Sequence, residues 1–207
     1  MDPRQQATIA AYDEAAAAYF ERWQDHRPRD AAKRFAALAG RGAVVCDLAC
    51  GPGVDLRVLR DAGVTVVAGD AAPSAMRLAR TYFPKGALAQ WDFRRLPVAE
   101  SSFDGVWACA ALEHVPLAEL RPTLAEVVRV QRRGPIFCCF REGRCDLQRV
   151  EDEPAEPVYA TAITAEELQA LLLEAGYRRV EIERRPDLRG RAEPTWLHAF
   201  GQLPAEG

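Results

Sequence analysis

The chain has 207 residues, of which 49% are hydrophobic and 28% charged, and its 27 basic and 30 acidic side chains give a net charge of −3. This balance is typical of one globular domain and argues against a generic nucleic-acid binder, because a phosphate backbone requires a basic surface. No apolar run approaches the length of a membrane span, and the first residues do not resemble a secretory signal. We therefore expect a cytoplasmic enzyme or binding domain with neither nucleic-acid nor membrane partners.

The expected elements begin with a helical segment. Residues 1–40 are rich in alanine and place apolar side chains along one helical face, which predicts an N-terminal helical cap. From residue 43 onward, strand and helix patterns alternate. The sequence predicts helices at 54–62, 73–82 and 117–132, and strands at 43–48, 64–68, 87–90, 105–110 and 136–140.

The remaining segment departs from this alternation. Residues 142–162 are acidic and contain prolines, which predicts a long lid-like loop. Thr164 and Glu167 then form a capping box for a helix that ends at Gly176, and strands at 180–183 and 196–200 follow as a hairpin.

The predicted strands are mostly apolar on both faces and are separated by helices. Parallel sheets covered on both sides have this pattern. The predicted fold class is therefore α/β, a single domain over residues 1–207 with a doubly wound, mostly parallel sheet of seven strands and a Rossmann-like topology.

The six cysteines include no Cys-x-x-Cys pair. Cys138, Cys139 and Cys145 form one candidate set of metal ligands, but adjacent residues on a strand face opposite sides. We expect buried free thiols and no metal site.

A candidate ligand site lies where the first predicted strand turns into a helix. Asp47 precedes Gly51 and Gly53 there, and glycines at such a turn let a ligand approach the backbone. Many α/β turns need glycine only for their shape, so the turn alone is weak evidence. Asp70 ends the second strand and Asp92 follows the third. Acids at the carboxyl ends of three consecutive strands face the crevice where such sheets bind ligands.

Two stretches resemble the class I S-adenosylmethionine-dependent methyltransferases of the small bacterial type. Residues 44–53 (VVCDLACGPG) are similar to motif I of this family, and residues 101–116 (SSFDGVWACAALEHVP) to its fourth-strand signature. The similarity extends to residues 12–19 and 196–200 and so covers nearly the whole chain. It implies the Rossmann-like fold of this family, methyl transfer, and S-adenosylmethionine as the cofactor.

The resemblance also implies roles for the matching positions. Asp47 would bind the ammonium group of the cofactor, Asp70 its ribose hydroxyls and Asp92 its adenine amine. Tyr12 and Tyr19 would close over the carboxylate end, although both also fit the core of an amphipathic helix. The cofactor-binding residues implied in this way are Tyr12, Tyr19, Asp47, Ala49, Gly51, Gly53, Asp70, Ala71, Asp92, Phe93 and Ala110.

The catalytic candidates are Glu113 and His114, which follow the fourth strand. Attack on a sulfonium carbon needs positioning and exclusion of water, and an acceptor of high pKa also needs a base. His114 is the candidate general base, because its unperturbed pKa suits the task. A structural role for the pair, in hydrogen bonds to a neighbouring loop, fits the sequence equally well.

Acceptor binding is expected at the parts added to the fold, namely the N-terminal helix, the 142–162 segment and the final hairpin. Aromatic rings there would stack on a flat acceptor and Arg141 would bind an anionic one. Arg141 and Arg144 fit equally well as partners of the acids at 151–153. The arginines between residues 178 and 191 alternate with acids, which predicts a self-neutralising surface. The candidate substrate-binding residues are Trp23, His114, Arg141 and Tyr159.

The sequence thus predicts a methyltransferase that acts on a small molecule, with the acceptor atom undetermined. One alternative is a domain of this fold that binds S-adenosylmethionine without transferring its methyl group. Another is a nicotinamide-dependent oxidoreductase. The latter is disfavoured because Leu56 stands where the dinucleotide fingerprint has its third glycine.

Overall fold

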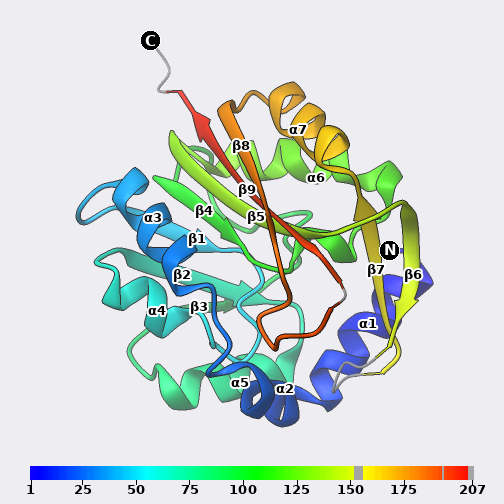
Figure 1. Ribbon diagram of the computed structural model, residues 1–207. Helices are drawn as coiled ribbons and strands as arrows, with labels where there is room; N and C mark the ends of the chain where they lie inside the picture. The colour runs from blue at the N-terminus through cyan, green and yellow to red at the C-terminus, as the bar shows by residue number, and fades with distance from the viewer. Residues whose placement is uncertain (152–155, 193, 205–207) are drawn as a thin grey trace.

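The computed structural model describes residues 1–151, 156–192 and 194–204. A twisted sheet crosses the centre of the molecule and helices cover both of its faces (Figure 1). The strands are β1 Val44–Asp47, β2 Thr65–Asp70, β3 Ala87–Gln90, β4 Gly105–Ala108, β5 Gly134–Glu142, β6 Cys145–Val150, β7 Val158–Ile163, β8 Arg178–Arg185 and β9 Trp196–Leu203. The helices are α1 Pro3–Glu14, α2 Ala16–Trp23, α3 Arg29–Ala39, α4 Leu56–Asp61, α5 Pro73–Tyr82, the short 3-10 helix η1 Leu112–His114, α6 Leu117–Val130 and α7 Ala165–Glu174.

Seven strands form the body of the sheet in the order β3-β2-β1-β4-β5-β9-β8. The first five run parallel, and β9 is antiparallel to both β5 and β8. The strand order reverses between β1 and β4. In doubly wound sheets, ligands bind outside the carboxyl ends of the strands at this switch point. The predicted α/β fold class, with its mostly parallel sheet, is confirmed.

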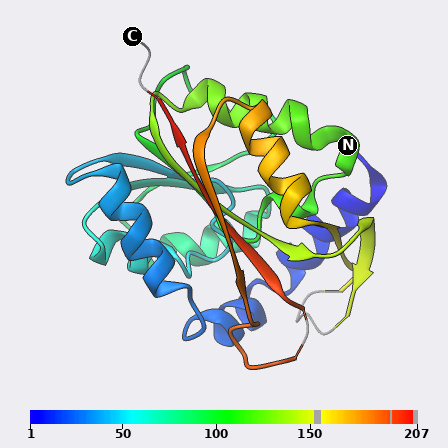
Figure 2. The same ribbon diagram turned by 45° about the horizontal axis from the view of Figure 1, so that its top comes forward.

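The two faces of the sheet bury separate apolar clusters. Phe35 of α3 packs with Trp107 and Phe137 on one face, which α4 and α5 also cover. The opposite face packs against α6 and α7 through leucines such as Leu124 and Leu172, and the turned view separates these two layers (Figure 2). In the described part of the chain, no helix is long and apolar enough to cross a membrane.

The N-terminal helices do not act as one cap. Helices α1 and α2 pack against α5 and, for α1, against β7, whereas α3 packs on the face of the sheet beside β5. The predicted cap therefore corresponds to α1 and α2. Apolar side chains of α3, including Phe35, belong instead to the core.

The prediction of a lid-like loop over residues 142–162 is wrong. This segment contains β6 and β7, which pair antiparallel, and β7 continues the sheet by pairing with Arg141 and Glu142 of β5. Five of the six residues of β7 are buried. The acidic, proline-bearing composition belongs to the connection between the two strands, and it hid the apolar pattern of β7. Asp152 and Glu153, named above as partners of the arginines, lie outside the described residues.

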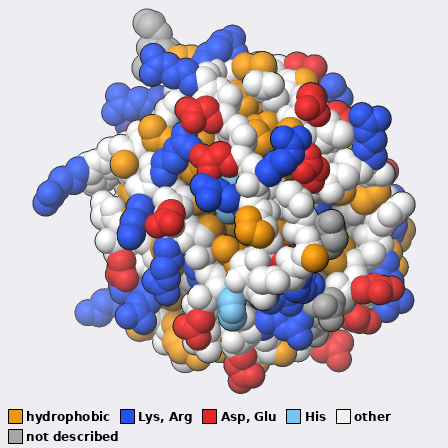
Figure 3. All heavy atoms as spheres, in the orientation of Figure 1, with side chains coloured by type: hydrophobic (Ala, Val, Ile, Leu, Met, Phe, Trp, Pro, Cys, Tyr) orange, Lys and Arg blue, Asp and Glu red, His pale blue; other side chains and the backbone are white. Residues whose placement is uncertain are grey.

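Acids pair with Arg184 and Arg185 of β8, in part as predicted. Arg34 of α3 binds both Glu181 and Glu183 at 2.6 and 2.8 Å, and Arg184 binds Glu142 at 2.7 Å. Figure 3 shows basic and acidic side chains interspersed over this face of the molecule. Exposed pairs of this kind contribute at most about 1 kcal/mol each. Their effect is to prevent a single-sign patch.

The capping box of α7 permits a first stability test. The Thr164 side chain accepts a hydrogen bond from the backbone of Glu167, and the Glu167 side chain accepts one from the backbone of Thr164. Thr164→Ala is expected to lower the free energy of unfolding by about 1 kcal/mol, because the amide of Glu167 loses its acceptor. Thr164→Ser, which keeps the hydroxyl, should lose less than half of that in urea titrations. Equal losses in both variants would contradict the capping role.

Candidate functional site

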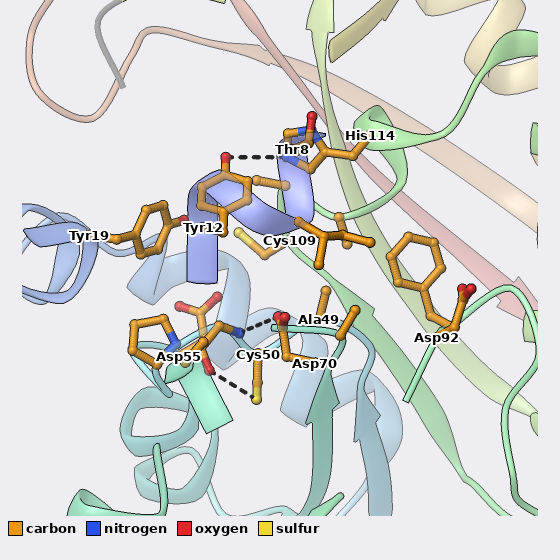
Figure 4. A pocket seen from close by; sticks show the side chains of 18 of the residues that line it. Thr8, Tyr12, Tyr19, Ala49, Cys50, Asp55, Asp70, Asp92, Cys109 and His114 are labelled. Carbon is orange, nitrogen blue, oxygen red and sulfur yellow. Dashed lines mark hydrogen bonds between the residues drawn. The ribbon is translucent and has the colours of Figure 1, made fainter. Parts of the chain in front are cut away.

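A cavity lies at the carboxyl ends of β1 to β4 and is closed from above by α1 and α2 (Figure 4). The empty space in it, counted together with its opening to solvent, is about 960 Å³. The structure brings nine of the eleven predicted cofactor-binding residues to its wall. They are Tyr12, Tyr19, Ala49, Gly51, Asp70, Ala71, Asp92, Phe93 and Ala110.

Gly53, one of the two exceptions, does not line the cavity. It has φ +90°, and a Cβ at this position would lie 3.2 Å from both Leu56 and Phe83. This glycine is therefore needed for the turn and for packing beneath it, not for the approach of a ligand. Gly51 differs, because it lines the cavity and adopts φ +52°. Its backbone N–H points to Asp70.

Asp70 organises the floor of the cavity. Its carboxylate accepts hydrogen bonds from the backbone N–H of Gly51 at 2.8 Å and of Ala72 at 2.9 Å. Burial raises the pKa of Asp70, and these backbone donors oppose the shift without cancelling it. Each carboxylate oxygen accepts more than one hydrogen bond, so both keep capacity for hydroxyl donors of a ligand.

Asp47, the other exception, lies buried beneath the cavity among further charges. Arg27 and Asp55 form an ion pair there with two contacts of 2.5 Å, and Trp107 Nε1 also donates to Asp55 at 2.9 Å. Burial and the charges of Asp55 and Asp70 raise the pKa of Asp47 well above its ordinary value, and Arg27 opposes this only in part. Oδ2 of Asp47 is buried and has no hydrogen-bond partner in the part of the chain that the structure describes.

Arg27 and Asp55 also line the cavity, although neither is among the residues predicted from the sequence. Asp55 lies in the motif I turn. Its position directly before α4 is the sequence feature that could have identified it as a site residue. Arg27 lies in the linker between α2 and α3, where no pattern distinguishes it from neighbouring arginines. Only the fold brings it to a carboxylate 28 residues away.

Asp92 lies at one end of the cavity (Figure 4), and its chain neighbour Phe93 also lines the cavity. Arg94 holds its carboxylate at 2.6 Å and also contacts Glu119 at 3.0 Å and the side chain of Gln5 at 3.1 Å. Burial alone would raise the pKa of Asp92, but the hydrogen bonds from Arg94 outweigh it and hold the pKa below its ordinary value. Asp92 is therefore ionised at neutral pH, and Arg94 balances its charge.

His114 faces the cavity from η1, and its ring orientation follows from two contacts. Nδ1 lies 2.8 Å from the backbone carbonyl of Tyr159, and Nε2 lies 3.4 Å from the hydroxyl of Tyr12. A carbonyl only accepts, so we assign the hydrogen to Nδ1, which leaves Nε2 as an acceptor. Tyr159 thus positions His114 through its backbone. Its side chain lines neither of the two cavities described here, which does not support its predicted contact with substrate.

Glu113 is buried between His114 and Arg141. Its carboxylate oxygens lie 3.9 Å from Nε2 of His114 and 3.5 Å from Nε of Arg141. Burial raises the pKa of Glu113 to about 7, against the lowering effect of the Arg141 guanidinium. Glu113 is consequently poised to change its charge near neutral pH.

This raised pKa predicts a pH-dependent stability. The folded protein binds more protons than the unfolded chain between the ordinary pKa of 4.5 and the folded pKa of about 7, so the stabilising effect of neutral Glu113 is lost as the pH rises through that range. Relative to wild type, Glu113→Gln is expected to gain about 2 kcal/mol in the free energy of unfolding between pH 5 and pH 8. Urea titrations at both pH values measure this gain, with exposed Glu174→Gln as the control. A difference that does not change with pH would contradict the shift.

A second cavity, of about 550 Å³, adjoins the first. Of the predicted substrate-binding residues, Trp23 and Arg141 line it, whereas His114 lines the first cavity. Its other walls come from the linker after α2, the ends of β4 and β5, and the β8–β9 hairpin. The residues that line it are Tyr12, Tyr19, Trp23, Arg27, Pro28, Cys109, Ala110, Glu113, Cys139, Arg141, Leu188, Trp196 and His198.

All six cysteines are free thiols. Cys109 and Cys139 are close together, with 3.9 Å between their sulfurs, and Cys139 also accepts a hydrogen bond from the backbone of Ala110. The hydrogen bond from Cys139 is the main cause that raises the pKa of Cys109 well above its ordinary value, and burial adds to it. This thiol therefore stays protonated. Cys138 and Cys139 are buried, as predicted, whereas Cys109 and Cys145 are partly exposed.

Comparisons with known proteins agree with this architecture. Residues 45–134 match the family model described as a methyltransferase domain. The malonyl-[acyl-carrier protein] O-methyltransferase of Enterobacter lignolyticus is 31% identical over 138 residues, which are 66% of this chain and 54% of that protein. The chain spans about half the length of the curated relatives it matches.

Solved structures share the fold at lower identity. The 1,6-didemethyltoxoflavin-N1-methyltransferase of Burkholderia thailandensis, solved with bound 1,6-didemethyltoxoflavin and S-adenosylhomocysteine, has a TM-score of 0.73 and 21% identity over 100% of this chain and 92% of that one. The [4+2]-cyclase SpnF has a TM-score of 0.68 and 18% identity over 87% and 82%. At these identities, the likeness shows the fold alone.

The sheet order and the position of the carboxylate-lined cavity at the switch point are those of the class I methyltransferase fold. Residues 45–134 match a methyltransferase domain, and the chain is similar to S-adenosylmethionine-dependent methyltransferases. The family resemblance found in the sequence is confirmed.

Proposed function

We propose that the protein transfers a methyl group from S-adenosylmethionine to a small-molecule acceptor. The observation that carries this proposal is the excess of buried carboxylates at the first cavity. Asp55 and Asp70 line this cavity and Asp47 lies beneath it, with Arg27 as the balancing cation. Within the described residues, Oδ2 of Asp47 has no hydrogen-bond partner. A ligand with an ammonium and a sulfonium group fits this environment. The pyrophosphate of a nicotinamide dinucleotide, in contrast, would meet like charge.

In this proposal, different residues of the first cavity bind different chemical groups of the ligand. Asp47 balances the ammonium group, and Asp70 accepts from the two ribose hydroxyls while it holds Gly51 in place. Asp92 accepts from the adenine amine, with Phe93 alongside. Tyr19 closes the end of the cavity that would hold the methionine part of the ligand. The other predicted residues of the wall complete this enclosure. The group bound there supplies an electrophilic methyl carbon on a positively charged sulfur.

His114 acts as the general base for an acceptor that must lose a proton. Its Nε2 is the acceptor nitrogen of the ring, and the carbonyl of Tyr159 fixes this tautomer from behind. Bound S-adenosylmethionine would supply the methyl carbon to the acceptor atom and would leave as S-adenosylhomocysteine, and Nε2 of His114 would take the proton that the acceptor loses. Exclusion of water by α1 and α2 favours this attack over hydrolysis.

His114→Asn tests the role as a base. We expect kcat to fall about 100-fold for an acceptor of high pKa, because general bases contribute about 10²- to 10⁴-fold, while the affinity for S-adenosylhomocysteine stays within about threefold. The pH profile of kcat should also lose its acidic limb. A variant with normal kcat and an unchanged profile would leave His114 with a structural role.

The second candidate function is binding of S-adenosylmethionine without methyl transfer. It is favoured by the structural likeness to the [4+2]-cyclase SpnF, which shows that this fold also hosts a cyclase. Formation of S-adenosylhomocysteine separates the two functions, because only methyl transfer produces it.

Calorimetric titration with S-adenosylmethionine, S-adenosylhomocysteine and NADH tests the proposal. We expect micromolar binding of both adenosyl ligands and none of NADH. Mass spectrometry of reactions with small-molecule acceptors then detects S-adenosylhomocysteine. An absence of adenosyl binding would overturn the proposal, and binding of NADH in its place would favour the oxidoreductase.

A further inference from the structure

The second cavity shares a wall with the cofactor cavity. Tyr12, Tyr19, Arg27, Cys109 and Ala110 line both of them. A molecule bound in the second cavity would therefore lie next to a molecule bound in the first, with these five residues at the junction. The strands supply the floor of this junction, and α1 and α2 supply its roof.

Aromatic and apolar side chains form most of the remaining wall. The rings of Tyr19 and Trp23 lie with 6.1 Å between their centroids, and Trp196 and Leu188 approach from the β8–β9 hairpin. The guanidinium of Arg141 lies over the Trp196 ring, 4.9 Å from its centroid. Aromatic rings in the wall of a cavity favour a flat, aromatic ligand.

Two buried polar atoms of this wall have no hydrogen-bond partner. Within the described residues, they are the indole Nε1 of Trp23, a residue only 8% exposed, and Oε2 of Glu113, a residue only 2% exposed, which has a charge contact with Nε of Arg141 at 3.5 Å but accepts no hydrogen bond. A buried donor or acceptor without a partner costs about 1–3 kcal/mol, so such atoms are usually satisfied. A ligand that carries both an acceptor for Trp23 and a donor for Glu113 would remove both costs.

The two arginines of the cavity wall each lie beside a carboxyl group. Arg27 is paired with Asp55, and Arg141 lies beside Glu113. Burial and the positive charge of Arg185 lower the pKa of His198 to about 4, so this ring is neutral at pH 7. Bringing a charged ligand here would cost desolvation without a counter-charge. The cavity therefore suits a neutral ligand.

We propose that the second cavity is the methyl-acceptor site and takes a neutral, flat heteroaromatic molecule with a ring N–H or hydroxyl donor and a separate carbonyl or ring-nitrogen acceptor. The inference rests on the proposed methyl transfer for its biological meaning. The binding of such a ring is a property of the cavity itself. Glu113 and Trp23 are the residues that select this class.

Titration calorimetry with two matched compounds tests the class, in the presence and absence of S-adenosylhomocysteine. 4-Quinolone has a ring N–H and a carbonyl, and 1-methyl-4-quinolone has the same rings and carbonyl without the N–H. We expect 4-quinolone to bind at least about tenfold more tightly, because the methylated compound cannot donate to Glu113.

Two variants separate the polar contacts from the aromatic wall. Trp23→Phe keeps a ring but removes the N–H, and Glu113→Gln keeps the shape but replaces one acceptor oxygen. Each is expected to weaken 4-quinolone binding about five- to tenfold, while binding of S-adenosylhomocysteine stays within about threefold, because neither residue lines the first cavity. Glu174→Gln, an exposed acid on α7, is the matched control and should change neither affinity.

Different results would contradict the acceptor class and the proposed methyl transfer. Equal affinity for the two quinolones, no binding of either, or a normal affinity in Trp23→Phe and Glu113→Gln would overturn the acceptor class. Loss of S-adenosylhomocysteine binding in wild type would instead overturn the proposed function. The titrations on the ligand-free protein would then still test the cavity.

Discussion

Asp70→Ala is expected to raise the dissociation constant for S-adenosylhomocysteine by about 100-fold or more. Asp70 lines the first cavity and holds the backbone N–H groups of Gly51 and Ala72. The variant loses its hydrogen bonds to the ribose and leaves both amides without an acceptor. Hydrogen bonds to charged groups contribute about 1.5–3 kcal/mol each, and about 1.4 kcal/mol corresponds to tenfold in affinity.

Two further variants make the Asp70 result specific. Asp70→Asn keeps one carbonyl acceptor and should lose about tenfold, which also guards against a loop that collapses in the alanine variant. Asp61→Ala removes an acid from the solvent-facing side of α4. The Asp61 side chain is 57% exposed, and its loss should not change the affinity for S-adenosylhomocysteine. Calorimetry measures all three, and a dissociation constant of Asp70→Ala within about threefold of wild type would contradict the assignment.

Arg27→Ala is expected to lower the free energy of unfolding by about 3–5 kcal/mol, which is the usual cost of removing one partner of a buried ion pair. The Arg27 and Asp55 side chains are each only 7% exposed, and both contacts between them are 2.5 Å. Without the guanidinium, Asp55 and nearby Asp47 remain buried with no compensating positive charge. The melting temperature should fall by about 10 °C, since about 1 kcal/mol corresponds to 2–4 °C at this chain length.

The matched control is Arg57→Ala on the surface of α4. Arg57 contacts Asp61 at 3.7 Å, its side chain is 78% exposed, and its loss should cost less than about 0.5 kcal/mol. In the double variant Arg27→Ala/Asp55→Asn, part of the lost stability should return, because the uncompensated charge is gone. Urea denaturation provides the free energies. A loss below about 1 kcal/mol in Arg27→Ala would show that the ion pair does not stabilise the fold.

The cofactor side of the site could be predicted because its signals are local. Asp70 ends β2 and Asp92 follows β3, and the carboxyl ends of parallel strands meet at one edge of the sheet. Each position follows from a strand pattern of a few residues and the turn after it. The same local patterns predicted the strands other than β6 and β7, and the capping box at Thr164.

The acceptor side depends on distant parts of the chain. The second cavity combines Trp23, Arg141 and Leu188, which come from the α2 end, from β5 and from the β8–β9 hairpin. No short sequence pattern links these segments. Because they are far apart in the chain, their contact cannot be predicted from local patterns and arises only when the sheet forms.

The sequence by itself determined the alternation of elements, the fold class and the acids at the strand ends, since periodicity and turn residues act over a few positions. Only the tertiary structure decided that residues 142–162 contain two strands, that Gly53 serves packing, and that Arg27 neutralises Asp55. Burial sets these outcomes, because a side chain's neighbours, charge balance and unsatisfied hydrogen bonds exist only once distant segments share one interior.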